Sequence, residues 1–483
     1  MIFLYIALVW FMGFGVVRLL FPGPPRWSLH TVFLLSLGAG VGIGIASCLY
    51  FLCLSLAGPK LIVLASVEGA ALALTIVGCA ITWKRSGVTL EWARGPVVPW
   101  YLTGLLLLAV ASAATMLVVY TLNKPHGEWD AWAIWNLRAR FFERGGDVWR
   151  NAFSNQLAWS HPDYPLLLPG IVAMCWTLAK VESTNAPVAI AFLFTLGTAG
   201  LLISTLGILR GKAQAFIGGI LLLGTASFVE NGANQYADIP LSFFMLASLA
   251  LFCIQDRYPD KPGIGILAGA MAGFAAWTKN EGLMFLLVLI VARAIAIFRY
   301  GNRSLWMPQF LRIAGGVVPP LAVVAFFKLR FAPSNEFMAK PARDIIHHAA
   351  DVGRWITALE GFLRAPFVVG GFLIPIAVLM AVYWYLVRFK VEERDRLSLA
   401  TLLIALCLML AGDFAVYLLF PGDVVWQMNT SMERLFLQVW PAGLLAFFLA
   451  ANPPQLVRAP VMAEKSKPSK RASKQGRKAA ETR

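Results

Sequence analysis

The chain of 483 residues is 59% hydrophobic and only 14% charged, with a mean hydropathy of +0.70. Soluble domains are roughly 45 to 50% apolar and about 25% charged, so this composition excludes a soluble globular protein. The formal net charge of +16 comes in large part from the C-terminal tail and from short turns between apolar runs. Such a distribution sets membrane topology and favours contact with anionic lipid, and it does not indicate nucleic-acid binding.

Apolar runs long enough to cross about 30 Å of hydrocarbon recur along the chain and predict an all-α polytopic membrane protein. The first run has no basic segment before it and no small-residue cleavage site, so we expect a retained span rather than a signal peptide. The first four spans are expected at 1–20, 30–57, 61–83 and 100–121.

Basic residues cluster in alternate turns and predict the topology by the positive-inside rule. We expect the N-terminus outside, the C-terminus in the cytoplasm, and about 13 full spans in a cytoplasmic (inner) membrane. External turns are then expected at 230–238, 278–282, 331–364 and 421–434. One apolar segment, 166–180, breaks the alternation, because about 15 residues give roughly 22 Å of helix and both flanking loops must lie outside. We predict a partial or re-entrant helix there.

Glycine and cysteine patterns have packing explanations. Gly38, Gly40, Gly42 and Gly44 alternate within the second span and predict close helix packing, since no strand precedes them and no lysine follows them as in a phosphate loop. The six cysteines lie in apolar runs without metal-ligand spacing and are expected to be free core residues.

A long polar segment, 123–169, follows the fourth span and is the first candidate site. Glu128 and Asp130 stand two residues apart at the membrane exit, before an amphipathic stretch, 131–142, that contains Arg138. A carboxylate there can take a proton from an acceptor hydroxyl, while a nearby cation offsets charge on a phosphate leaving group. The alternative is an interfacial helix whose acids only pair with its bases.

Five motifs in the same order resemble those of the C-type membrane glycosyltransferases. This group uses polyprenyl-phosphate sugars and includes protein O-mannosyltransferases and lipid A aminoarabinose transferases. The motifs are an ExD pair (128–130), an HPPL-like element (161–166), a second acidic motif (234–240), a GLAALTKGP-like turn (273–282) and an RYLLPxxP-like span start (433–441). The resemblance covers roughly 100–451. It divides the chain into a three-span N-terminal extension (1–98), a transmembrane catalytic module (99–451) and a disordered basic cytoplasmic tail (452–483).

The resemblance implies a role for individual residues. Asp130 is the expected general base for the acceptor, Glu128 orients it or shares a cation, and Asp238 is a second acidic contact. Lys279, Arg434 and Arg138 are the expected contacts of the donor phosphate. A snorkelling boundary residue is an equally good explanation of Lys279. The other loop candidates are His161, Asp163, Tyr236 and Glu281.

The implied function is transfer of a sugar from a polyprenyl-phosphate donor to a hydroxyl of an external lipid, glycan or protein acceptor. No cofactor is required by the motifs. A divalent metal is possible, although Glu128 and Asp130 alone are too few ligands. The segment 331–364 contains a probable amphipathic helix that is a candidate mobile cover over the site, and its adjacent His347 and His348 point about 100° apart, which argues against a shared metal.

Glu68 and Asp413 support a different function. Both acids lie within apolar spans, where an unpaired carboxyl costs about 2.5 to 3.5 kcal/mol. They favour a secondary transporter or a flippase for lipid-linked sugars, and a non-catalytic assembly protein is a third alternative. Transporters of this kind show repeated halves, which this sequence lacks, and most acids here are expected at the outer face.

Overall fold

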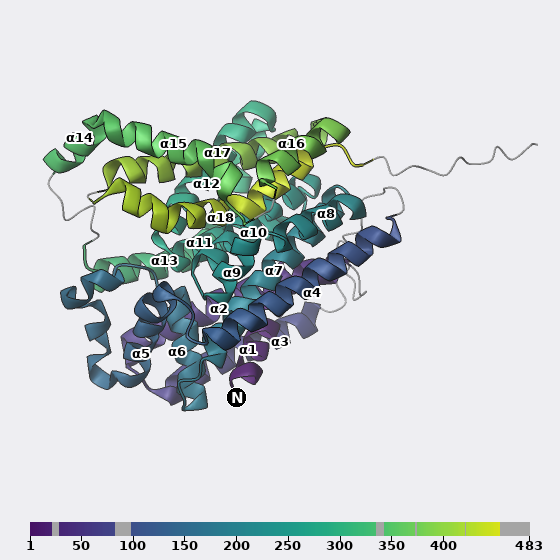
Figure 1. Cartoon of the computed structure of the whole chain (residues 1–483). Coiled ribbons are helices and arrows are strands. Elements are labelled where there is room, and N and C mark those ends of the chain that lie inside the picture. The colour runs from purple at the N-terminus through teal and green to yellow at the C-terminus, as the bar shows by residue number, and fades with distance from the viewer. Residues whose placement is uncertain (22–28, 83–97, 335–341, 372–373, 421, 455–483) are drawn as a thin grey trace, which may run out of the picture.

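The computed structural model describes residues 1–21, 29–82, 98–334, 342–371, 374–420 and 422–454. It is 85% helical, and its described residues form no strand, which confirms the all-α class (Figure 1). The helices are α1 Ile2–Leu20, α2 Leu29–Ala57, α3 Leu61–Thr82, α4 Trp100–Asn123, α5 Asn136–Arg144, α6 Leu167–Ala179, α7 Asn185–Leu209, α8 Lys212–Leu223, α9 Ala226–Ala233, α10 Asp238–Arg257, α11 Pro262–Thr278, α12 Asn280–Tyr300, α13 Trp306–Arg330, α14 Ala342–Ala350, α15 Val352–Val368, α16 Ile376–Val387, α17 Arg396–Leu419 and α18 Val424–Ala450.

Ten of the described helices are long and apolar enough to cross a membrane, which supports a multi-pass membrane protein. The count is eleven if α8 and α9, which meet at a 60° bend, form one span. The count of about 13 from the sequence also includes α11 and α16, which are apolar but shorter. That count stays a prediction, as do the orientation and the proposed division of the chain at residue 98.

Helix α6 occupies the segment for which we predicted a partial helix. It has 13 residues, or about 20 Å, and it ends at Lys180 in a left-handed conformation (φ 53°). Ten of its residues are buried, and it packs against α2 and α5. Its length agrees with a helix that does not cross the bilayer, and its depth stays a prediction.

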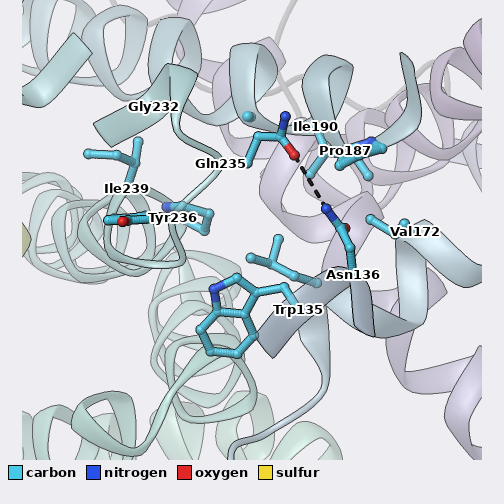
Figure 2. Close-up of a pocket in the computed structure, with 12 residues that line it drawn as sticks. Trp135, Asn136, Val172, Pro187, Ile190, Gly232, Gln235, Tyr236 and Ile239 are labelled. Carbon is cyan, nitrogen blue, oxygen red and sulfur yellow. Dashed lines mark hydrogen bonds between the residues drawn. The ribbon is translucent and has the colours of Figure 1, made fainter. Parts of the chain in front are cut away.

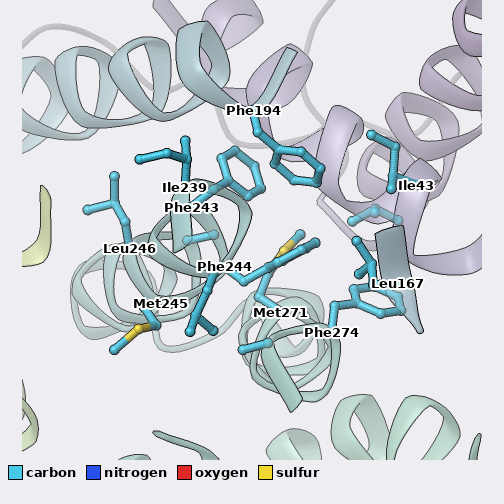
Figure 3. Close-up of a cluster of buried hydrophobic side chains, with 14 of the residues drawn as sticks. Ile43, Leu167, Phe194, Ile239, Phe243, Phe244, Met245, Leu246, Met271 and Phe274 are labelled. Carbon is cyan, nitrogen blue, oxygen red and sulfur yellow. The ribbon is translucent and has the colours of Figure 1, made fainter. Parts of the chain in front are cut away.

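Helix α10 is the centre of the bundle, since its whole apolar stretch is buried. Phe243 and Phe244 of α10 contact Phe194 of α7 edge-on, and Phe274 of α11 closes the same cluster beside Leu167 (Figure 3). The predicted glycine packing is confirmed here, because a methyl group on α2 at Gly40 or Gly44 would collide with these rings. The N-terminal helices therefore pack within the same core as the rest.

The two ends of α10 carry the two main groups of buried charge. Asp238 is its first residue, and Asp256 lies near its end, about 27 Å away along the helix. At the Asp256 end, Arg293 pairs with Asp256, and Asp395 accepts from Arg210 at 3.3 Å and from Arg257 at 3.1 Å. The ends of α7 and α10, the second half of α12 and the start of α17 thus meet at one end of the bundle, and α10 is long enough to separate the two ends by nearly a hydrocarbon thickness.

Both expected external turns contain helix, which was predicted for 331–364 but not for 421–434. The first contains α14 and α15, and α18 already begins at Val424, capped by the Asp423 carboxylate. Arg354 explains the helix in the first segment. It is buried and donates to the carbonyl oxygens of Tyr417, Phe420 and Gly422, which the end of α17 leaves unpaired. Lys340 of the predicted amphipathic helix lies outside the described residues.

The contact between α1 and α2 generates a stability prediction. A methyl group on Gly13 would lie 2.0 Å from the Gly38 carbonyl oxygen, whereas one on Gly69 of α3 meets nothing within 4 Å. We expect Gly13→Ala to lower the stability of the purified protein by about 1 to 3 kcal/mol, because α1 must move. Gly69→Ala is the matched control and should be neutral or stabilising by up to about 1 kcal/mol. Equal thermal midpoints for the two variants would contradict this packing.

Candidate functional site

Asp238 is the centre of the candidate site. It is fully buried at the first turn of α10, where the helix dipole favours a negative charge. Its Oδ1 accepts from Lys279 Nζ at 3.0 Å and from Gln438 Nε2 at 2.6 Å, and its Oδ2 accepts from Arg434 Nε at 3.0 Å and Nη2 at 2.8 Å. Arg434 and Gln438 reach it together because residues four apart share a face of α18.

Arg434 connects this group to the polar loop. Its Nη2 also donates to Oδ2 of Asp130, which is 304 positions away in the sequence. Its guanidinium lies over the Tyr236 ring, 4.4 Å from the ring centroid. Burial raises the pKa of Tyr236 to about 12, so this phenol stays neutral at physiological pH. The structure therefore brings together three residues that the sequence motifs assigned to one site: Asp130, Asp238 and Arg434.

Lys279 joins the same cluster from the break between α11 and α12. Its backbone is extended there, so α11 ends at Thr278 and α12 begins at Asn280. The ammonium group contacts Glu281 Oε1 at 2.7 Å as well as Asp238. Lys279 is only 6% exposed, and a buried ammonium flanked by two carboxylates is stabilised in its charged form. The alternative of a snorkelling lysine at a lipid boundary does not fit this environment.

The HPPL-like element holds the loop against the bundle. Asp163 accepts from Asn280 Nδ2 at 2.8 Å, and its carbonyl oxygen accepts from Lys328 Nζ at 2.6 Å. Tyr164 stacks between Trp135 and His161, with ring centroids 5.7 and 4.9 Å away. The hydrogen bonds of Asp163 and the stacking of His161 on Tyr164 therefore fix the position of the loop beside the cluster.

Two predicted site residues lie outside the cluster. Glu128 pairs with Lys124, and its side chain is 35% exposed at the rim of an open hollow. Arg138 is 1% exposed and donates to the backbone oxygens of Ile134 and Ser160. Burial lowers the pKa of Arg138 to about 10, which still leaves it charged at neutral pH. Its guanidinium is engaged inside the folded loop, so a phosphate contact from Arg138 is not supported.

The turn before α10 is tied to the loop by backbone and amide contacts. Glu128 N donates to Asn234 O at 3.2 Å, and Gln235 Nε2 donates to Pro125 O at 3.1 Å. Gln235 also accepts from Asn136 at 3.4 Å, beside a cavity of about 20 Å³ that Tyr236 helps to line (Figure 2). That cavity has room for about one water molecule, so it is not a substrate site.

A metal ion does not fit the cluster as it stands. Across the described ranges, no three His, Cys, Asp or Glu side chains are grouped so that they could hold one. Asp130 and Asp238 are both bound to the Arg434 cation, which would repel a divalent metal. The arrangement instead offers carboxylates and cations for an organic or phosphate ligand.

Three residues of this region were not singled out from the sequence. Gln438 had a usable signal, since it lies one helical turn after Arg434 on the same face. Asn280 and Lys328 had none, because their common contact with Asp163 joins segments 117 and 165 positions apart.

Comparisons of the chain with protein-family models, with curated proteins and with solved structures found no match. The resemblance to C-type glycosyltransferases therefore depends on the motifs alone and stays a prediction. The geometry of the cluster is the independent information about function.

The unequal burial of the two aspartates predicts unequal effects on stability. Asp238→Asn should cost about 3 to 5 kcal/mol, because it leaves Lys279 and Arg434 buried without their shared carboxylate. Asp130→Asn should cost less, because Arg434 keeps both bonds to Asp238. Thermal midpoints of the purified variants test this order. A larger loss for Asp130→Asn would show that Asp238 is not the centre of the network.

Proposed function

We propose that the protein is an integral membrane glycosyltransferase that moves a sugar from a polyprenyl-phosphate donor to a hydroxyl group of an acceptor on the external side. The observation that supports this most is the convergence of Asp130, Asp238, Lys279 and Arg434 from four separate segments. Acceptor activation needs a carboxylate and donor departure needs fixed cations, and both kinds of group occur within this one cluster.

The proposed reaction is a single displacement. The acceptor oxygen attacks the anomeric carbon while its proton passes to the Asp130 carboxylate. The bond from the anomeric carbon to the phosphate oxygen breaks on the opposite side, and its electron pair leaves with the polyprenyl phosphate. The sugar is thereby transferred with inversion, and no redox partner is needed.

The two cations retain capacity for a phosphate. Arg434 donates hydrogen bonds to the two aspartates through Nε and Nη2. Its Nη1 makes no hydrogen bond to the residues that the structure describes. The Lys279 ammonium has three protons and contacts two carboxylates. Asp238 is then a positioning residue that holds both cations at one place.

An open hollow in the polar loop, lined by Glu128 and Trp132 on either side of Asp130 in the sequence, is the proposed approach for the acceptor. It has a volume of about 600 Å³, and its lining includes Lys124, His126, Glu128, Trp132 and Arg140. Charged groups and an exposed indole suit a polar lipid, glycan or protein acceptor. In this arrangement Glu128 lies at the rim, where it contacts the acceptor rather than Asp130.

Acids within the apolar helices favour a transporter or a lipid-linked-sugar flippase as the second candidate. Asp413 is 1% exposed within α17, and Glu68 lies within α3 with one oxygen bound to Tyr5 at 2.7 Å. Intramembrane carboxyls of this kind serve ion or proton movement in transporters. The cluster at the end of α10 has no role in that alternative, which is why we place it second.

The role of Asp130 gives a direct test. Asp130→Asn keeps the size of the side chain but removes the base, so transfer from a lipid-linked donor by purified protein should fall about 10² to 10⁴-fold. Glu128→Gln is the matched control on the same loop, and its turnover should change by less than about tenfold.

A thermal midpoint accompanies each turnover value, so that loss of folding is separated from loss of chemistry. Near-normal turnover of the Asp130→Asn protein, or a larger loss for Glu128→Gln, would overturn the assignment of the base.

A further inference from the structure

Asp413 is an exception among the buried acids of this protein. Both of its carboxyl oxygens are buried, and neither has a hydrogen-bond partner among the described residues. Other buried acids, such as Asp238, Asp256 and Asp395, each have a cationic partner. An unpaired carboxyl in an apolar helix is costly, so a functional ligand is the first explanation to test.

Asp413 faces the start of α12. Its neighbour Gly412 packs so closely there that a methyl group on it would lie 2.4 Å from Met284 Sδ. Glu281 lies one turn before Met284, and Glu281 and Lys279 both act electrostatically on Asp413. Glu281 Oε1 binds Lys279, but its Oε2 is buried without a partner in the described part of the chain. Asp413 and Glu281 thus have three buried carboxyl oxygens without a hydrogen-bond partner, and they lie on two helices, α17 and α12, that pack against each other.

Several other charged groups on the helices packed against α17 already have partners, and Glu433 of α18 accepts from Gly370 N. The pairs are Arg434 of α18 with Asp130 and Asp238, Arg354 of α15 with His348 of α14 and the carbonyls at the end of α17, and Asp256 of α10 with Arg293 of α12. Lys279 is the cation that reaches this place, and it is shared between Asp238 and Glu281. The two cations Lys279 and Arg434 cannot neutralise all four carboxylates, those of Asp130, Asp238, Glu281 and Asp413.

We propose that Asp413 and Glu281 form an internal proton-binding site that holds one proton between them at neutral pH. Two carboxyls close together in a medium of low dielectric favour a state in which one of them is protonated. A metal cation is a poorer occupant, because the Lys279 ammonium lies 2.7 Å from Glu281 and no third acidic or histidine ligand is grouped with the pair among the described residues. This inference does not rest on the proposed glycosyl transfer.

The site is connected to the outer cluster by direct contacts. Ion pairs run from Asp130 through Arg434, Asp238 and Lys279 to Glu281, whereas Asp413 makes no hydrogen bond to this row and is linked to it through charge alone. A change of charge at the outer cluster therefore changes the strength of the ion pair between Lys279 and Glu281. The proton affinity of Asp413 and Glu281 changes with it.

Infrared spectroscopy of the purified full-length protein in lipid nanodiscs tests the proposal without any substrate. A protonated carboxylic acid has a carbonyl band that is separate from that of a carboxylate and shifts in heavy water. We expect this band at neutral pH in the unmodified protein and its loss in Asp413→Asn. Glu68→Gln is the matched control, because it removes the other intramembrane carboxyl and should leave the Asp413 band in place.

Carbon-13 labelling of aspartate carboxyls in the unmodified protein covers the case in which Asp413→Asn does not fold. The label should shift the band, because Asp413 contributes to it. A labelled-aspartate band that persists in folded Asp413→Asn, or the absence of any labelled-aspartate band, would overturn the proposal. A band that appears only when sodium is replaced by choline would also overturn it, since the pair would then be a cation site.

Discussion

The contact of one guanidinium, that of Arg434, with two aspartates is the interaction on which this structure depends most. It joins the polar loop at Asp130 to the head of the central helix at Asp238, and it lies in α18, the last helix. Asp238 can be fully buried only because Arg434, Lys279 and Gln438 supply four donor contacts to it. Removal of any one partner leaves charge in an environment that solvates it poorly, so the parts of this site depend on one another.

The length of α10 imposes a second constraint. Its apolar middle is buried on all sides, so polar groups concentrate at its two ends. The Asp256 end is a closed network in which Arg210, Arg257 and Arg293 meet acids and helix-end carbonyls. The Asp238 end has the same chemistry but is joined through Arg434 to the polar loop, where Glu128 helps to line an open hollow. This difference between the two ends is the physical reason for assigning chemistry to one and structural support to the other.

The sequence predicted the helical class, most of the spans and the close glycine contacts, because these depend on local composition and on helical spacing. It also predicted that Asp130, Asp238, Lys279 and Arg434 belong together. It could not predict which atoms meet, since the Asp130–Arg434 contact joins residues 304 positions apart. It did not reveal the partners of Arg138, because these are backbone carbonyls, which no side-chain pattern shows. It also predicted a helix within 331–364, where α14 and α15 lie, but not the contacts of Arg354 with the end of α17.

The central claim is that the cluster at the head of α10 binds the phosphate of a lipid-linked donor. The most direct measurement is an experimental structure of the protein in lipid with a polyprenyl phosphate bound. The account predicts phosphate oxygens within hydrogen-bond distance of Lys279 Nζ and Arg434 Nη1, with Asp238 still between the two cations. A phosphate bound elsewhere, with the contacts of Lys279 and Arg434 unchanged, would contradict it.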